Sequence, residues 1–207
     1  LSKSRESLFT TLRTLGINPL FWGLLITLTT FGLSQGMIVS QIFPLLKSRG
    51  LSSSQTVIFA SCIGPMQVLA RLILFTIEPL TKRKFSMLSI CLIAFLCIGF
   101  SSLALAIEES IAFVTMFVIM AGGTYGLFSI IRPVMTAELL GRENFGVIAS
   151  VVVLGDVWGS AFAPGLAGTI GEHRSYDTVL ITVSMVATIG FISAIGMSFR
   201  ANNTIRD

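Results

Sequence analysis

Six long apolar stretches constrain the fold of this chain more than any other feature of its sequence. They lie at about 19–46, 55–80, 85–107, 111–137, 145–170 and 179–199. A helix that crosses the hydrocarbon core of a bilayer needs about 20 mostly apolar residues, so each stretch is long enough. The continuous apolarity of 86–106 does not fit the alternating pattern of a membrane β-barrel strand. The sequence therefore predicts an all-α membrane protein with six transmembrane helices.

The composition leads to the same class of protein. Charged residues make up 12% of the chain and apolar residues 53%, whereas an ordinary soluble domain carries roughly 25% charged residues. A soluble fold of this size could not cover its surface with so few charges. The net charge of +4 has no basic stripe with interleaved aromatic residues, so a nucleic-acid partner is not expected. Membrane lipid is the expected surrounding.

The loop charges predict an orientation in the membrane, because Lys and Arg are retained on the cytoplasmic side. With the N-terminus inside, nine basic residues are cytoplasmic and three lie on the opposite side. The nine are Lys3, Arg5, Arg13, Lys82, Arg83, Lys84, Arg142, Arg200 and Arg206, and the three are Lys47, Arg49 and Arg174. We therefore expect both ends in the cytoplasm, with the protein in the plasma membrane or a bacterial inner membrane.

A weak internal similarity predicts a repeat of three helices. At an offset of 89 residues Pro44 falls on Pro133, and VIFAS (57–61) falls on GVIAS (146–150). Apolar runs of equal length would also align by coincidence, which is the alternative. The repeat predicts a 3+3 inverted arrangement, typical of secondary transporters, with repeats at about 19–107 and 108–199. A cytoplasmic linker or amphipathic segment (1–18) and a cytoplasmic tail (201–207) flank the transmembrane domain (19–200).

Ionisable and polar residues within the apolar stretches are the candidate functional residues, since hydrocarbon excludes charge unless a partner or an aqueous cavity is present. Asp156 lies near the middle of the fifth stretch, and its counterpart at the offset of 89 is Gln67. Gln67 and Arg71 share a helix face. They extend a polar seam that also contains Ser61, Gly64 and Glu78.

Each of these residues has a structural alternative. Arg71 could bind an anionic substrate, pair permanently with Asp156, or extend toward the cytoplasmic interface. Asp156 could bind a proton or cation, or make a fixed bond between helices. Arg132, which precedes Pro133, is expected to reach the interface or anchor a loop.

Two glycine-flanked segments supply further candidates. Ser34 in GLSQG (32–36) and Tyr125 in GGTYG (122–126) could contact a substrate. Small polar residues also join helices in lipid, which is the alternative for Ser34. Gly155 and Gly159 form a G-x-x-x-G pattern that favours close approach of two helices.

These residues resemble the C-terminal six-helix half of the major facilitator superfamily. IGPMQVLAR (63–71) is similar to the eighth helix of that fold, PLTKRKF (79–85) to the basic loop after it, and APGLAG (163–168) to the end of the eleventh helix. The resemblance implies an N-terminal six-helix half as a partner and about twelve helices in all. Arg71 matches the anion-binding position of monocarboxylate porters. Gln67 stands where an acidic residue is expected, which leaves Asp156 for coupling.

The function expected from these observations is secondary transport of a small organic solute by alternating access, as a symporter or antiporter. The solute is anionic if Arg71 binds it. One alternative is a self-contained six-helix subunit that acts as a homodimer or structural partner. Another is an intramembrane hydrolase using LGD (154–156) and YD (176–177). No Walker, zinc-protease or serine-hydrolase motif is present, so we expect neither an enzyme nor a cofactor or metal.

Overall fold

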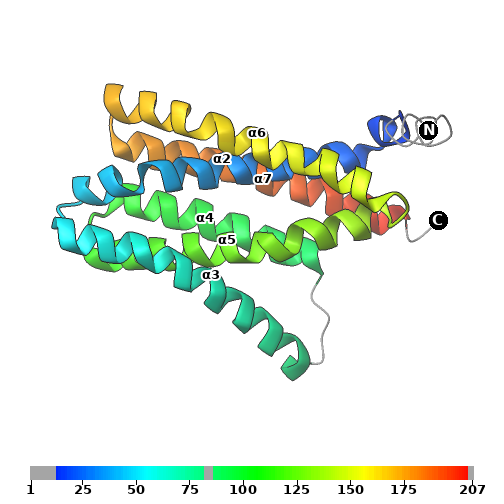
Figure 1. Cartoon of the computed structure of the whole chain (residues 1–207), viewed down its shortest axis with the longest axis horizontal. Coiled ribbons are helices and arrows are strands. Elements are labelled where there is room, and N and C mark those ends of the chain that lie inside the picture. The colour runs from blue at the N-terminus through cyan, green and yellow to red at the C-terminus, as the bar shows by residue number, and fades with distance from the viewer. Residues whose placement is uncertain (1–12, 82–85, 205–207) are drawn as a thin grey trace.

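The computed structural model of the chain is a bundle of long α-helices (Figure 1). The structure describes residues 13–81 and 86–204, and residues 13–17 form a short helical segment. The long helices in this part of the chain are α2 (Pro19–Ser48), α3 (Ser53–Thr81), α4 (Met87–Ile107), α5 (Ile111–Leu140), α6 (Phe145–His173) and α7 (Tyr176–Thr204). Each coincides with one predicted stretch to within a few residues.

All six of these helices are long and apolar enough to cross a membrane. The shortest has 21 residues and the longest have 30, and at about 1.5 Å rise per residue even the shortest spans roughly 30 Å of hydrocarbon. The chain is therefore a multi-pass membrane protein, as the sequence predicts.

Local sequence signals determine where the helices begin and end. At the start of α2, Pro19 occupies the first turn and the Oδ1 of Asn18 accepts a hydrogen bond from the Leu20 N–H at 2.9 Å, which satisfies a free donor of the helix end. Gly50 and Gly141 have positive φ angles of 75° and 84° just after α2 and α5, a conformation that glycine adopts without steric cost.

The helices pack in a simple order. Helix α2 packs mainly against α6 and α7, α5 packs mainly against α3 and α4, and α4 packs against α7. An aromatic cluster lies where α2, α4 and α5 meet: Phe31 stacks on Phe128 with ring centroids 3.5 Å apart, and Phe95 meets Phe128 edge-on at 5.4 Å. All three rings are buried, so they fix the centre of the bundle.

Glycines allow α2 and α6 to approach closely. A Cβ atom on Gly32 of α2 would overlap the backbone carbonyl of Asp156, and one on Gly159 of α6 would overlap the backbone of Thr29. Gly155 also lies against Thr29. The predicted role of Gly155 and Gly159 in close helix contact is confirmed. This contact places Asp156 directly against α2.

Helix α3 is the least covered of the six. Among residues 53–77, whose side chains are described, only Thr56 is buried. After crossing α5, the helix leaves the bundle (Figure 1). Its exposed side chains are mostly apolar, among them Ile58, Val68, Leu72 and Phe75. Lipid or another protein must therefore cover most of this helix.

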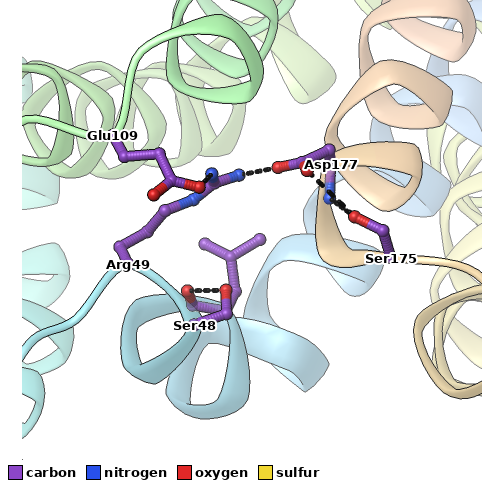
Figure 2. A network of polar contacts seen from close by, with 6 residues as sticks. Ser48, Arg49, Glu109, Ser175 and Asp177 are labelled. Atoms are coloured by element: carbon purple, nitrogen blue, oxygen red, sulfur yellow. Dashed lines mark hydrogen bonds and ion pairs between the residues drawn. The ribbon is translucent and has the colours of Figure 1, made fainter.

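One end of the bundle, here called the loop end, carries the connections after α2, α4 and α6. There the guanidinium of Arg49 is buried and pairs with two carboxylates (Figure 2). Its Nη1 lies 2.7 Å from Glu109 Oε1, and its Nη2 pairs with Asp177 Oδ1. Ser175 Oγ donates to Asp177 Oδ2 at 2.9 Å. This group, the Arg49 cluster, ties three connections together.

At the opposite end, here called the terminal end, α2 begins and α7 ends (Figure 1). The described chain therefore starts and finishes at the same end of the bundle, as six helices require. Several residues used to predict the orientation lie outside the described residues: Lys3, Arg5, Lys82, Arg83, Lys84 and Arg206. The side chain of Glu78 is also outside the described part.

Candidate functional site

An ion pair between α5 and α6 lies within the transmembrane bundle. The Nη2 of Arg132 is 2.6 Å from the Oδ2 of Asp156. Asp156 is 11 residues after Phe145, the first residue of α6 (156 − 145), in a helix of 29 residues, which is roughly 17 Å along its axis. The side chain of Asp156 is 14% exposed and that of Arg132 is 29% exposed. The pair is therefore deep in the bundle but accessible.

The direction of the helices explains why Arg132 and Asp156 meet. Side chains on an α-helix lean toward its N-terminus. Helix α5 begins at the loop end and α6 at the terminal end, so Arg132 leans away from the terminal end while Asp156 leans toward it. The expectation that Arg132 reaches the nearer interface is wrong for this reason. Asp156 pairs with Arg132, and the alternative of a permanent Arg71–Asp156 pair is also wrong.

A cavity of about 290 Å³ opens beside this ion pair. Helices α2, α5 and α6 contribute its walls, and the cavity combines the ion pair with polar and apolar side chains. The lining residues are Phe31, Gln35, Gly36, Val39, Ser40, Tyr125, Arg132, Asp156, Ser160 and Pro164. We call this space the ion-pair cavity.

A second cavity of about 390 Å³ lies between α2, α3 and α5. It contains the predicted polar seam of α3, represented by Ser61, Gly64 and Gln67. Tyr125 lines both cavities. The residue is 42% exposed, and among the described residues its hydroxyl has no hydrogen-bond partner. Three of the predicted site residues, Gln67, Tyr125 and Asp156, thus lie around two neighbouring spaces.

The other two predicted substrate residues lie elsewhere. The Nε of Arg71 donates to the Gly126 carbonyl at 3.2 Å, and Arg71 is not among the residues that line the two cavities. Ser34 is fully buried, and its hydroxyl lacks a partner in the described part of the chain. Gln35, rather than Ser34, lines the ion-pair cavity. Substrate binding by Arg71 and Ser34 therefore stays a prediction, and neither residue lines one of the two cavities.

Sequence reasoning missed two residues of this site, Arg132 and Gln35. Gln35 is buried, and its amide nitrogen donates to Thr124 Oγ1 at 3.2 Å and the Ala121 carbonyl at 3.4 Å. A signal for Gln35 was present, because Thr124 is its counterpart at the offset of 89 (124 − 35). For Arg132, the signal was the direction of its helix, because the side chain leans toward the N-terminus of α5 and thus into the bundle.

The arrangement leaves Arg132 with donors that could bind a charged ligand. Arg132 has five N–H donors but makes one ion-pair contact, and its buried Nε has no hydrogen-bond partner among the described residues. Within residues 13–81 and 86–204, no group of three or more His, Cys, Asp or Glu residues could hold a metal ion.

No protein-family model matches the chain, and no curated protein matches it.

Proposed function

We propose that the chain is the membrane domain of a secondary transporter that moves a small organic anion by alternating access, with its substrate site in the ion-pair cavity. One observation carries the proposal: an ion pair lies inside the bundle, on the wall of a cavity. A charge at the centre of a bilayer costs at least about 2.5–3.5 kcal/mol on insertion scales. In membrane proteins such residues mark pathways for solutes and ions.

Asp156 is the proposed coupling residue. A carboxylate in this position that loses its arginine partner has no other charged partner among the described residues. It must then take up a proton or a cation, because an unpaired charge is unstable in hydrocarbon. Opening of the Arg132–Asp156 pair would therefore couple the binding of a solute to the binding of a proton or cation.

The packing order of the helices supports a 3+3 inverted repeat. If α2, α3 and α4 are exchanged with α5, α6 and α7, each main contact maps onto another main contact. The α2–α6 contact becomes α5–α3, the α2–α7 contact becomes α5–α4, and α4–α7 maps onto itself. A bundle with a twofold axis in the membrane plane has this property.

Individual residues support the same axis. Gln35 of α2 and Thr124 of α5 bond to each other, so the two helices that the axis would exchange meet at these residues. The glycine pair 32 and 36 lies against α6, and the pair 122 and 126 lies against α3. Gly36 contacts Ser160 and Gly126 contacts Gln67. These contacts favour Ser160, one turn beyond Asp156, as the counterpart of Gln67.

A second six-helix unit is the proposed partner, in line with the resemblance to the major facilitator superfamily. The sparse cover of α3 and the exposed aromatic pair Trp158 and Phe162 on α6 support it. These two helices flank the cavities formed with α2 and α5. A unit placed over them would enclose the solute between two halves, as alternating access requires. The terminal end is then cytoplasmic.

The alternatives predict different behaviour. A self-contained six-helix subunit would form homodimers and would not need flanking helices for uptake. An intramembrane hydrolase would need two neighbouring aspartates, but Asp156 pairs with Arg132 whereas Asp177 belongs to the Arg49 cluster at the loop end. This separation weighs against the hydrolase.

The test is uptake by the full-length protein in proteoliposomes under an imposed pH gradient, with labelled organic anions, cations and neutral solutes. We expect uptake of anions that varies with pH, and we expect Asp156→Asn to flatten the pH profile. Glu172→Gln, which changes an exposed carboxylate of the same helix, is the matched control. Absence of uptake for the whole panel would contradict the transporter proposal.

A further inference from the structure

We infer that the substrate is a carboxylate that binds the Arg132 guanidinium. In the absence of substrate, the carboxylate of Asp156 takes the same place on this guanidinium. The inference rests on the proposed transport function. It adds a residue, Arg132, that the sequence did not assign to the site, and it names the chemical class of the solute.

The first step is the incomplete bonding of the pair. Arg132 pairs with one carboxylate, that of Asp156, through a 2.6 Å contact between Nη2 and Oδ2. Its guanidinium has five N–H donors, enough for more than one carboxylate oxygen. The buried Nε of Arg132 has no partner among the described residues, although buried polar groups in proteins normally have one. The guanidinium therefore has unused bonding capacity.

The second step is the position of the pair on a cavity wall. Both side chains are partly exposed and both line the ion-pair cavity. Its volume of about 290 Å³ is at the small end of the range for small-molecule sites, about 300–1,000 Å³. A small carboxylic acid fits such a space. Phe31, Val39 and Pro164 offer apolar surface to its hydrocarbon part, and the unpartnered Tyr125 hydroxyl offers a second polar contact.

The third step is the choice between the two arginines near the cavities. Arg71 donates its Nε to the Gly126 carbonyl and lines neither cavity. Arg132 lines the ion-pair cavity and already binds a carboxylate there. Because that carboxylate belongs to the protein, a solute carboxylate can replace it with no change in the charge around Arg132. The displaced Asp156 then becomes available for a proton or cation.

The experiment measures the binding of benzoate and benzamide to the purified full-length protein in detergent by isothermal titration calorimetry. The two probes have nearly the same shape and differ in charge. We expect the wild type to bind benzoate and to discriminate against benzamide. Asp156→Asn removes the competing carboxylate, so benzoate should bind about tenfold more tightly, because the fraction of free Arg132 limits the apparent affinity.

Variants of Arg132 complete the test. Arg132→Gln should remove the discrimination between benzoate and benzamide, and Arg132→Lys should retain part of it, since a lysine keeps the charge without the planar fork. Glu109→Gln, which changes a carboxylate that pairs with Arg49 at the loop end, should leave benzoate affinity unchanged. If Arg132→Gln alone does not yield folded protein, the Arg132→Gln/Asp156→Asn double variant carries the same test without an unpaired charge.

Two results would overturn the inference. One is weaker benzoate binding in Asp156→Asn, which would make Asp156 a direct ligand or a structural residue. The other is equal binding of benzoate and benzamide by the wild type. If proteoliposomes take up only neutral or cationic solutes, the transport function stands, but the substrate is not a carboxylate. Failure to move any solute would instead refute the transport function.

Discussion

The Arg49 cluster and the Arg132–Asp156 pair hold their arginines in opposite ways. The side chain of Arg49 is 2% exposed and pairs with two carboxylates that are 65% and 45% exposed. The side chain of Arg132 is 29% exposed and pairs with one carboxylate that is 14% exposed. The first arginine pairs with two carboxylates and joins three connections, whereas the second pairs with one carboxylate and borders a cavity. The buried Nε of both arginines lacks a hydrogen-bond partner among the described residues, so the number of carboxylates and the cavity distinguish the two. The comparison separates a structural arginine from the arginine that we propose to be exchangeable.

The largest expected effect on stability comes from removing both carboxylates of the Arg49 cluster. Glu109→Gln with Asp177→Asn leaves a buried guanidinium without an anion, and breaking a buried pair in this way costs roughly 3–5 kcal/mol. Thermal unfolding in detergent should show a large fall in Tm. The neighbouring exposed residue provides the control, Glu108→Gln. An unchanged Tm would show that Arg49 does not depend on its partners.

A smaller loss is expected for Arg49→Met. This change removes the buried charge and fills much of its space, while both carboxylates are exposed enough to be hydrated. We expect a loss of about 1–2 kcal/mol, because apolar replacement of a buried charge is often tolerated. The same unfolding assay measures it. A loss as large as that of the double carboxylate variant would mean that the bridge between the loops, not the burial of charge, determines stability.

A still smaller loss is expected for Asp156→Asn. Arg132 still borders the cavity and its side chain is 29% exposed, so the free energy of unfolding should fall by about 1 kcal/mol. Added benzoate should raise the Tm of this variant more than that of the wild type, since a bound ligand stabilises the folded state. A loss comparable with that of the Arg49 cluster would remove the distinction between the two arginines.

The smallest effect on stability is expected for Arg71→Gln. Arg71 makes one hydrogen bond to a backbone carbonyl and is partly exposed, so its loss should leave membrane insertion and Tm unchanged. Uptake should also be retained, because Arg71 lines neither cavity and the proposed anion site is on Arg132. Arg174→Gln, in an exposed connection, is the control. Abolished uptake by Arg71→Gln, with normal insertion and Tm, would return anion binding to Arg71, as the sequence predicts.

Much of the site was visible in the sequence as a set of residue types. Polar groups within apolar stretches need a reason to be there, which predicts Asp156 and Gln67, and the glycine-flanked segment 122–126 predicts Tyr125. All three line the two cavities. Ser34 was selected in place of its neighbour Gln35. Successive residues of a helix point about 100° apart. To predict which of two neighbouring residues faces the cavity, the rotation of the helix about its own axis must be known. An almost uniformly apolar stretch does not reveal that rotation.

The sequence by itself determined the six membrane-spanning helices, because the thickness of hydrocarbon sets the length of each apolar stretch and free backbone polar groups are excluded from it. Only the tertiary structure decided that Asp156 pairs with Arg132 and not with Arg71. That choice depends on which helices are neighbours and on the end toward which each side chain leans. Neither property is written in the hydropathy of a single helix.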